Sequence, residues 1–127
     1  MRAPRLIRLN EAYVAAPATT DAEIAATIVH ETTHAWLEAR GFAYRAERRR
    51  RIEAICYRAE ASFVRRLPEG SVLASEYEEC RARVLAESDD HWSDAAFYEK
   101  NMARARALGV PEWLLAWSAR RRKRRAA

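Results

Sequence analysis

Apolar residues recur every three to four positions along most of the chain, which is the spacing of an amphipathic helix. The first such segment begins after Thr20 or Asp21, either of which can cap a helix by accepting a hydrogen bond from a first-turn amide. It runs to about Arg40, and Gly41 is well placed to adopt the left-handed helix ending. A second helix is predicted over roughly residues 47–67, where the sequence PEG stops it.

The second half of the chain predicts three more helices. One covers about residues 72–87, and the next begins after Ser93 and ends at Leu108, just before Gly109. Pro111 opens the last helix, since proline is favoured in a first helical turn. Only 3 glycines and 4 prolines interrupt the chain, so we expect about five helices joined by short turns.

Residues 5–14 differ from the rest because apolar and polar residues alternate in their sequence, RLIRLNEAYV. Alternation places successive side chains on opposite faces of a strand, so one short N-terminal strand is predicted. The predicted fold class is therefore mainly α, or α+β once the strand is counted. A length of 127 residues suits one compact core, so residues 1–127 are expected to form a single domain.

The composition indicates a folded protein, and the positive charge is unevenly distributed along the chain. Apolar residues make up 50% of the chain and charged residues 32%, which indicates a folded, soluble protein rather than a disordered one. The net charge of +5 is concentrated at residues 47–51 and in a basic tail at residues 119–127; without the six cations of residues 120–125 it would fall to −1. Two cysteines, Cys56 and Cys80, are too few for a disulfide framework and are expected to be free thiols.

No part of the chain has the sequence of a membrane or export signal. No apolar run approaches the roughly 18 residues that a membrane-spanning helix needs. The N-terminal sequence MRAPRLIRLNEAYV also lacks the continuous apolar region of a secretory signal. A cytoplasmic location is therefore expected.

The segment HETTH, residues 30–34, combines the residue types of a zinc site. On a helix, His30 and His34 rise from the same face one turn apart, close enough to bind one ion together. Glu31 then lies about 100° around the helix, beside that ion. In this H-E-x-x-H arrangement the imidazoles bind Zn²⁺ and the glutamate acts as general base toward a water that the metal activates. The motif therefore predicts metal-assisted hydrolysis.

A third protein ligand must come from further along the chain. The downstream candidates are Glu53, Glu60, Asp89, Asp90 and His91. We favour Glu53, because it follows His34 by 19 residues, enough for a helix end, a turn and an antiparallel second helix. Its neighbours Ile52 and Ile55 are expected to pack against the first helix and so hold the carboxylate inward.

Two residues near Glu53 each have two interpretations. Glu60 follows by two helical turns and shares the same face, where it can orient a ligating histidine through the second ring nitrogen. Alternatively, it is a solvated carboxylate paired with Arg58 or Arg65. Tyr57 can donate its phenol to the oxyanion that develops during peptide hydrolysis, or it is an amphipathic tyrosine of the core.

The stretch HETTHAWLEARGF, followed by RRIEAICYRAE, resembles the gluzincin metallopeptidases, and it is similar to minigluzincins and to the peptidase domain of the plant LIM-domain peptidases activated by ubiquitin. The resemblance covers about residues 28–60. It implies that His30 and His34 are zinc ligands, that Glu31 is the base and that Glu53 is the third ligand. The implied activity is that of a zinc-dependent endopeptidase acting on a peptide or protein substrate.

The same resemblance implies a reduced zincin-like fold, in which an edge strand aligns the peptide by main-chain hydrogen bonds. The strand predicted at residues 5–14 would be that edge strand. The family also places a histidine or tyrosine downstream to stabilise the oxyanion. In this chain, His91 is the residue expected to have that role. A histidine near a helix end also fits a capping or solvated role.

The basic tail ARRRKRRAA follows the amphipathic segment PEWLLAWSA. This combination suits binding to nucleic acid or to an anionic membrane. The simpler interpretation is a frayed tail next to aromatic residues that complete the core. The sequence therefore supports two alternative functions. One is a zinc-dependent peptidase, and the other is a catalytically silent zinc-binding domain that binds a protein or nucleic-acid partner through its arginine clusters.

Overall fold

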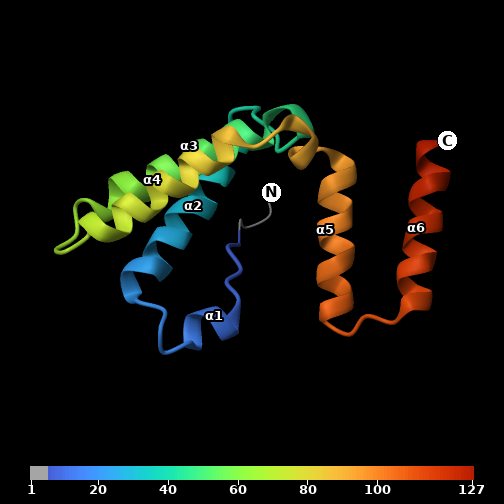
Figure 1. Ribbon diagram of the computed structural model, residues 1–127, viewed down its shortest axis with the longest axis horizontal. Helices are drawn as coiled ribbons and strands as arrows, with labels where there is room; N and C mark the ends of the chain where they lie inside the picture. The colour runs from blue at the N-terminus through green and yellow to red at the C-terminus, as the bar shows by residue number, and fades with distance from the viewer. Residues whose placement is uncertain (1–5) are drawn as a thin grey trace, which may run out of the picture. The chain divides into compact units, whose positions relative to one another are not determined.

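The computed structural model describes residues 6–127, and its chain divides into two compact units, Met1–Ser88 and Asp89–Ala127. Within the described residues every regular element is a helix, which confirms the mainly α class (Figure 1). The elements are α1 (Glu11–Ala15), α2 (Asp21–Ala39), α3 (Ala46–Val64), α4 (Ser71–Ala86), the 3₁₀ helix η1 (Asp89–Trp92), α5 (Asp94–Ala107) and α6 (Glu112–Ala126). The expectation of a single domain stays a prediction.

The predicted N-terminal strand does not form. Residues 6–10 have no regular secondary structure, and the following residues form α1 instead, while Arg5 lies outside the described residues. Asn10 starts α1 because its side-chain Oδ1 accepts a hydrogen bond from the Ala12 amide at 2.9 Å. A strand also needs a partner for its backbone groups, and residues 6–127 contain no other strand to supply one.

Both ends of α2 are fixed by the residues that the sequence marks for this purpose. At its start Thr20 and Glu23 form a reciprocal capping box: the Thr20 hydroxyl accepts from the Glu23 amide at 3.2 Å, and the Thr20 amide donates to the Glu23 carboxylate at 2.7 Å. At its end Gly41 adopts a positive φ of 87°, and the Phe42 amide donates to the Leu37 carbonyl at 3.0 Å. This ending reverses the chain toward α3.

The turn between α3 and α4 requires a glycine. Helix α3 ends at Val64, three residues earlier than predicted, and the chain then turns through Pro68 to α4. A Cβ atom on Gly70 would lie 1.8 Å from the Val64 carbonyl oxygen, so no larger residue fits without a backbone shift. Helix α3 packs against both α2 and α4, and the three lie side by side (Figure 1).

The core of the first unit consists of two small clusters along α3. The buried residues of one are Ala26, Val64 and Ala74, and those of the other are Leu37, Ile52 and Cys56. Ile55, which was expected to pack against the first helix, is instead 45% exposed, and Ile28 of α2 is 42% exposed. The second cluster joins α2 to α3 one turn away from His34, so it fixes the spacing of these two helices at the candidate site.

The second unit is a pair of antiparallel helices, α5 and α6 (Figure 1). Ser93 caps α5 by accepting from the Ala96 amide at 3.1 Å, and Gly109, with a φ of 81°, ends it. The guanidinium carbon of Arg122 lies 4.1 Å from the centre of the Tyr98 ring, which joins the end of α6 to the beginning of α5. Within the described residues, no helix has the length and apolar character needed to cross a membrane.

Candidate metal centre

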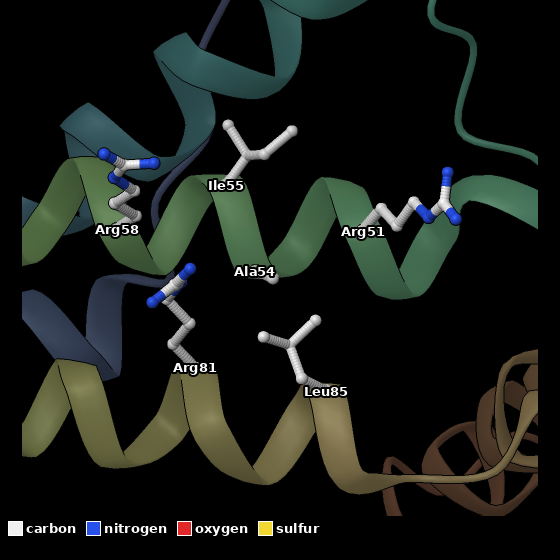
Figure 2. A pocket seen from close by; sticks show the side chains of 6 residues that line it. All are labelled: Arg51, Ala54, Ile55, Arg58, Arg81 and Leu85. Atoms are coloured by element: carbon white, nitrogen blue, oxygen red, sulfur yellow. The ribbon is translucent and has the colours of Figure 1, made fainter.

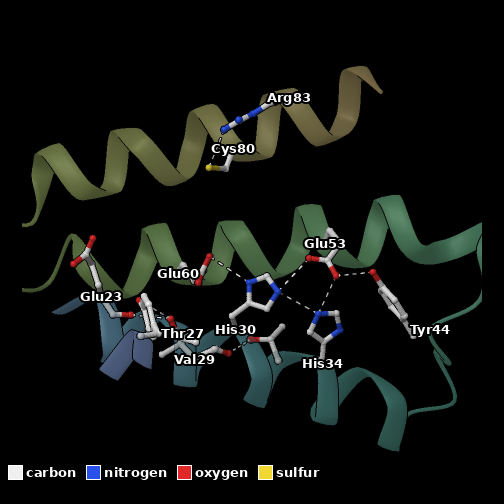
Figure 3. A network of polar contacts seen from close by, with 12 residues as sticks. Glu23, Thr27, Val29, His30, His34, Tyr44, Glu53, Glu60, Cys80 and Arg83 are labelled. Carbon is white, nitrogen blue, oxygen red and sulfur yellow. Dashed lines mark hydrogen bonds and ion pairs between the residues drawn. The ribbon is translucent and has the colours of Figure 1, made fainter. Parts of the chain in front are cut away.

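Side chains from α2 and α3 converge at one point of the first unit (Figure 3). The Nε2 atoms of His30 and His34 are 3.2 Å apart. The Glu53 carboxylate completes the group, with Oε2 at 3.1 Å from His30 Nε2 and Oε1 at 3.1 Å from His34 Nε2. The structure therefore brings together the three residues that the sequence analysis predicted as ligands.

Helix geometry explains this convergence. His30 and His34 are four residues apart on α2, so both rings leave the same face one turn apart. Helix α3 runs antiparallel to α2 after the turn at Gly41, and it presents Glu53 and Glu60, which are two turns apart, to that face. The carboxylates therefore alternate with the imidazoles along the interface.

The donor set fits a zinc ion. Zinc–nitrogen and zinc–oxygen bonds of about 2.0–2.1 Å place neighbouring ligands of a tetrahedral site about 3.3 Å apart. The three contacts among His30, His34 and Glu53 are 3.1, 3.1 and 3.2 Å, close to that spacing. The side chains are 14%, 23% and 14% exposed, so the group is shielded on most sides but retains access to solvent. Two imidazoles and one carboxylate are also the ligand types of catalytic zinc sites.

Cys56 is a further donor at the same point. Ligand atoms of His30, His34 and Cys56 lie within 4.8 Å of one another, close enough to bind a metal ion. The thiol is free and fully buried, and its burial, together with the negative charges of Glu53 and Glu60, raises the pKa of Cys56 to about 12. Geometry favours Glu53 as the third candidate, because its oxygens lie 3.1 Å from the two Nε2 atoms, whereas the ligand atoms of the group with Cys56 lie up to 4.8 Å apart.

Glu60 lies behind His30, on the side away from His34. It is only 4% exposed, and its Oε2 is 3.3 Å from His30 Nδ1. Burial alone would lower the pKa of His30, but hydrogen bonds to Glu53 and Glu60 and the charges of both carboxylates outweigh it and raise this pKa to about 10. A carboxylate at Nδ1 keeps a proton there and directs Nε2 toward the site. Arg65, one alternative partner of Glu60, instead pairs with Glu78 at 3.0 Å.

Tyr44 is a site residue that sequence reasoning missed. It lies in the connection between α2 and α3, and its hydroxyl donates to Glu53 Oε1 at 2.8 Å. Its ring meets the His34 ring edge to face, with the ring centres 5.2 Å apart. Burial of Tyr44 and the nearby charge of Glu53 raise the pKa of the phenol, which keeps it a donor. No sequence motif identifies Tyr44, because its contact with Glu53 depends on the path of the connection between α2 and α3.

Glu53 receives hydrogen bonds from three sides, and these keep its carboxylate ionised and fixed in orientation. Burial alone would raise the pKa of Glu53, but hydrogen bonds from His30, His34 and Tyr44 lower it well below the usual value. The carboxylate is therefore ionised at neutral pH. An ion bound here would replace the Nε2 protons of His30 and His34, while the hydrogen bond from Tyr44 would still orient the Glu53 carboxylate.

The two other residues predicted around the first motif also lie in the first unit. The Tyr57 ring is 5.3 Å from the His30 ring, edge to face, and burial raises the pKa of its phenol. Glu31 is exposed on α2, and its charge is close enough to contribute to the raised pKa of Cys56. Both are therefore near the imidazoles, and their roles stay predictions.

The remaining candidates belong to the second unit. His91 is exposed in η1, with its Nε2 atom 2.9 Å from the Lys100 ammonium nitrogen and its ring 5.7 Å from that of Trp92. Asp89 and Asp90 begin the same short helix. The proposed contribution of His91 to an oxyanion site stays a prediction.

Another cavity, of about 270 Å³, lies on a different face of α3 (Figure 2). Its lining residues are Arg51, Ala54, Ile55, Arg58, Arg81 and Leu85. Ile55 is two residues from Glu53, so it points to nearly the opposite side of the helix. This cavity offers no imidazole, thiol or carboxylate, so it is not the metal centre.

Comparison of the chain with protein-family models, curated proteins and solved structures finds no match in any of the three. The function of the protein is therefore inferred from the residues of the candidate metal centre and their geometry.

Proposed function

We propose that this protein is a zinc-dependent metallopeptidase of the gluzincin type, which hydrolyses peptide bonds in a peptide or protein substrate. The observation that supports the proposal best is the convergence of His30, His34 and Glu53, from two helices, at contacts of 3.1–3.2 Å. Their spacing and chemistry suit zinc. The H-E-x-x-H motif adds a glutamate next to the first ligand.

Each residue has a defined role in this proposal. His30, His34 and Glu53 would hold the ion, which when bound supplies a water of lowered pKa and polarises the substrate carbonyl. The Glu31 carboxylate accepts the proton of the attacking water and passes it to the leaving amine nitrogen. The Tyr57 phenol, kept protonated by burial, donates to the oxyanion of the substrate.

The proposal is tested by separating metal binding from catalysis in the Glu31→Gln variant. We expect the zinc-loaded parent to cleave a labelled unfolded protein and a chelator to abolish cleavage. Glu31→Gln should keep its zinc and lose activity by about 100-fold or more. Glu38→Gln is the matched control, because Glu38 is exposed on the same helix two turns later, and it should keep full activity. Undiminished cleavage by Glu31→Gln would refute the proposed base.

A second function has one observation in its favour. Residues 6–127 contain no strand that could align a peptide substrate by main-chain hydrogen bonds. A catalytically silent zinc-binding domain would not need such a strand. It predicts tight zinc binding through His30, His34 and Glu53 without metal-dependent cleavage, so the same assay distinguishes it from the peptidase.

A further inference from the structure

Helix α6 carries an exposed face on which tryptophans and arginines are combined. Trp113 is 71% exposed and Trp117 is 49% exposed, so neither completes a core. At about 100° per residue, these rings and the guanidinium groups of Arg120, Arg121 and Arg124 lie within an arc of about 100°. The basic tail continues as helix to Ala126 rather than fraying at residue 119.

The other side of α6 carries its buried residue and its contact with α5. Leu115 is only 5% exposed, and Arg122 stacks on Tyr98 of α5. These contacts hold α6 with the tryptophan and arginine face directed away from them. Within the second unit, that face is therefore not covered by α5.

Two hollows flank Trp117, of about 290 and 460 Å³. One is lined by Trp117, Arg120, Arg121 and Arg124, and the other by Trp117, Ser118, Arg121, Arg122 and Arg125. Neither hollow has an acidic residue, and the one acidic residue of α6, Glu112, already accepts from Arg106 at 2.9 Å. The positive charge beside the indole is thus not neutralised within the helix, which favours a polyanionic ligand.

We propose that this face of α6 binds single-stranded nucleic acid. Arginines contact successive phosphates, and an exposed indole offers a stacking platform for an unpaired base. The guanidinium carbon of Arg121 already lies 5.3 Å from the centre of the Trp117 ring, so charge and stacking surface are adjacent. A helix lying in a membrane surface separates its apolar face from its cations around the axis, whereas α6 has tryptophans and arginines on one face.

The test uses the full chain and a labelled single-stranded oligothymidine, followed by fluorescence anisotropy as the salt concentration is varied. We expect Trp117→Ala to weaken binding by about fivefold to 150-fold. Replacing Arg120, Arg121 and Arg124 by glutamine should reduce the slope of log affinity against log salt by about 2, since each phosphate contact contributes about 0.7.

Matched controls separate a defined site from general attraction. Trp36 of α2 is 50% exposed, so Trp36→Ala should leave affinity unchanged. Replacing the three exposed arginines Arg51, Arg58 and Arg66 by glutamine removes the same charge and should change the slope by less than 1. Circular dichroism confirms that each variant is folded.

Three results would overturn the proposal. The first is equal weakening by the two triple arginine variants, which indicates net charge alone. The second is binding of duplex DNA as tightly as the single strand, with no loss in Trp117→Ala. The third is binding to phosphatidylserine vesicles without binding to the oligonucleotide, which identifies a membrane as the ligand. Binding that persists in Glu31→Gln and in chelator shows that this site is independent of the proposed peptidase.

Discussion

Zinc should stabilise the first unit, and the size of this effect should depend on Glu60, which touches the metal centre only through His30. The ion would link α2 to α3, so it binds the folded unit and not the unfolded chain. Glu60→Leu places an apolar side chain at this buried position and removes the carboxylate oxygen 3.3 Å from His30 Nδ1. Loss of such a supporting partner typically weakens metal affinity by about 10- to 100-fold.

The expected shifts in melting temperature follow from the size of the unit. Free zinc at about 100 times the dissociation constant stabilises by about 2.7 kcal/mol. The unit Met1–Ser88 has an unfolding entropy of about 0.18 kcal/mol/K, so its melting temperature should rise by about 15 °C. A 10-fold weaker site at the same zinc concentration gives about 8 °C, and a 100-fold weaker site about 2 °C.

The assay is thermal unfolding followed by circular dichroism, with and without zinc, for each variant. Subtracting the metal-free melting temperature of the same variant cancels any effect of the substitution on packing. Glu38→Leu, the same change at an exposed position of α2, should show the full shift of the parent. If Glu60→Leu also shows the full shift, then Glu60 does not support a zinc ligand and the reasoning is refuted.

Four further variants test the structure of the first unit by urea denaturation in chelator. Tyr44→Phe removes a hydrogen bond to the charged Glu53 and should reduce the free energy of unfolding by about 1.5 kcal/mol; no change would mean that the phenol is not bound there. Gly70→Ala brings a Cβ against a backbone carbonyl of α3 and should lose about 3 kcal/mol, and full stability would contradict that close approach. Ile52→Ala should lose about 3 kcal/mol and the exposed Ile55→Ala less than about 1 kcal/mol, so equal losses would contradict the assigned core.

Local signals in the sequence predicted the helices well. The cap at Thr20, the reversal at Gly41 and the cap at Ser93 each act through hydrogen bonds to nearby residues, so a short stretch contains the whole cause. The convergence of His30 with His34 is local for the same reason, since four residues on one helix fix it.

Features that depend on distant contacts were predicted less well. The alternation at residues 5–14 indicated a strand, but a strand needs a partner, and the capping side chain of Asn10 favours a short helix. Tyr44 was missed because its contact with Glu53 depends on the path of a connection. Ile55 was assigned to the core because periodicity gives a face but not the element that covers it.

The register between α2 and α3 explains why the metal centre and the core cannot vary independently. His30 lies between two carboxylates that are two turns apart on α3, at 3.1 Å from Glu53 and 3.3 Å from Glu60. A shift of α3 by one residue would rotate both carboxylates by about 100° and remove them from the histidines together. Packing of Leu37 against Ile52 opposes this shift, because Leu37 is buried one turn from His34 and Ile52 is buried next to Glu53. The apolar contacts between α2 and α3 therefore set the positions of Glu53 and Glu60 relative to the histidines.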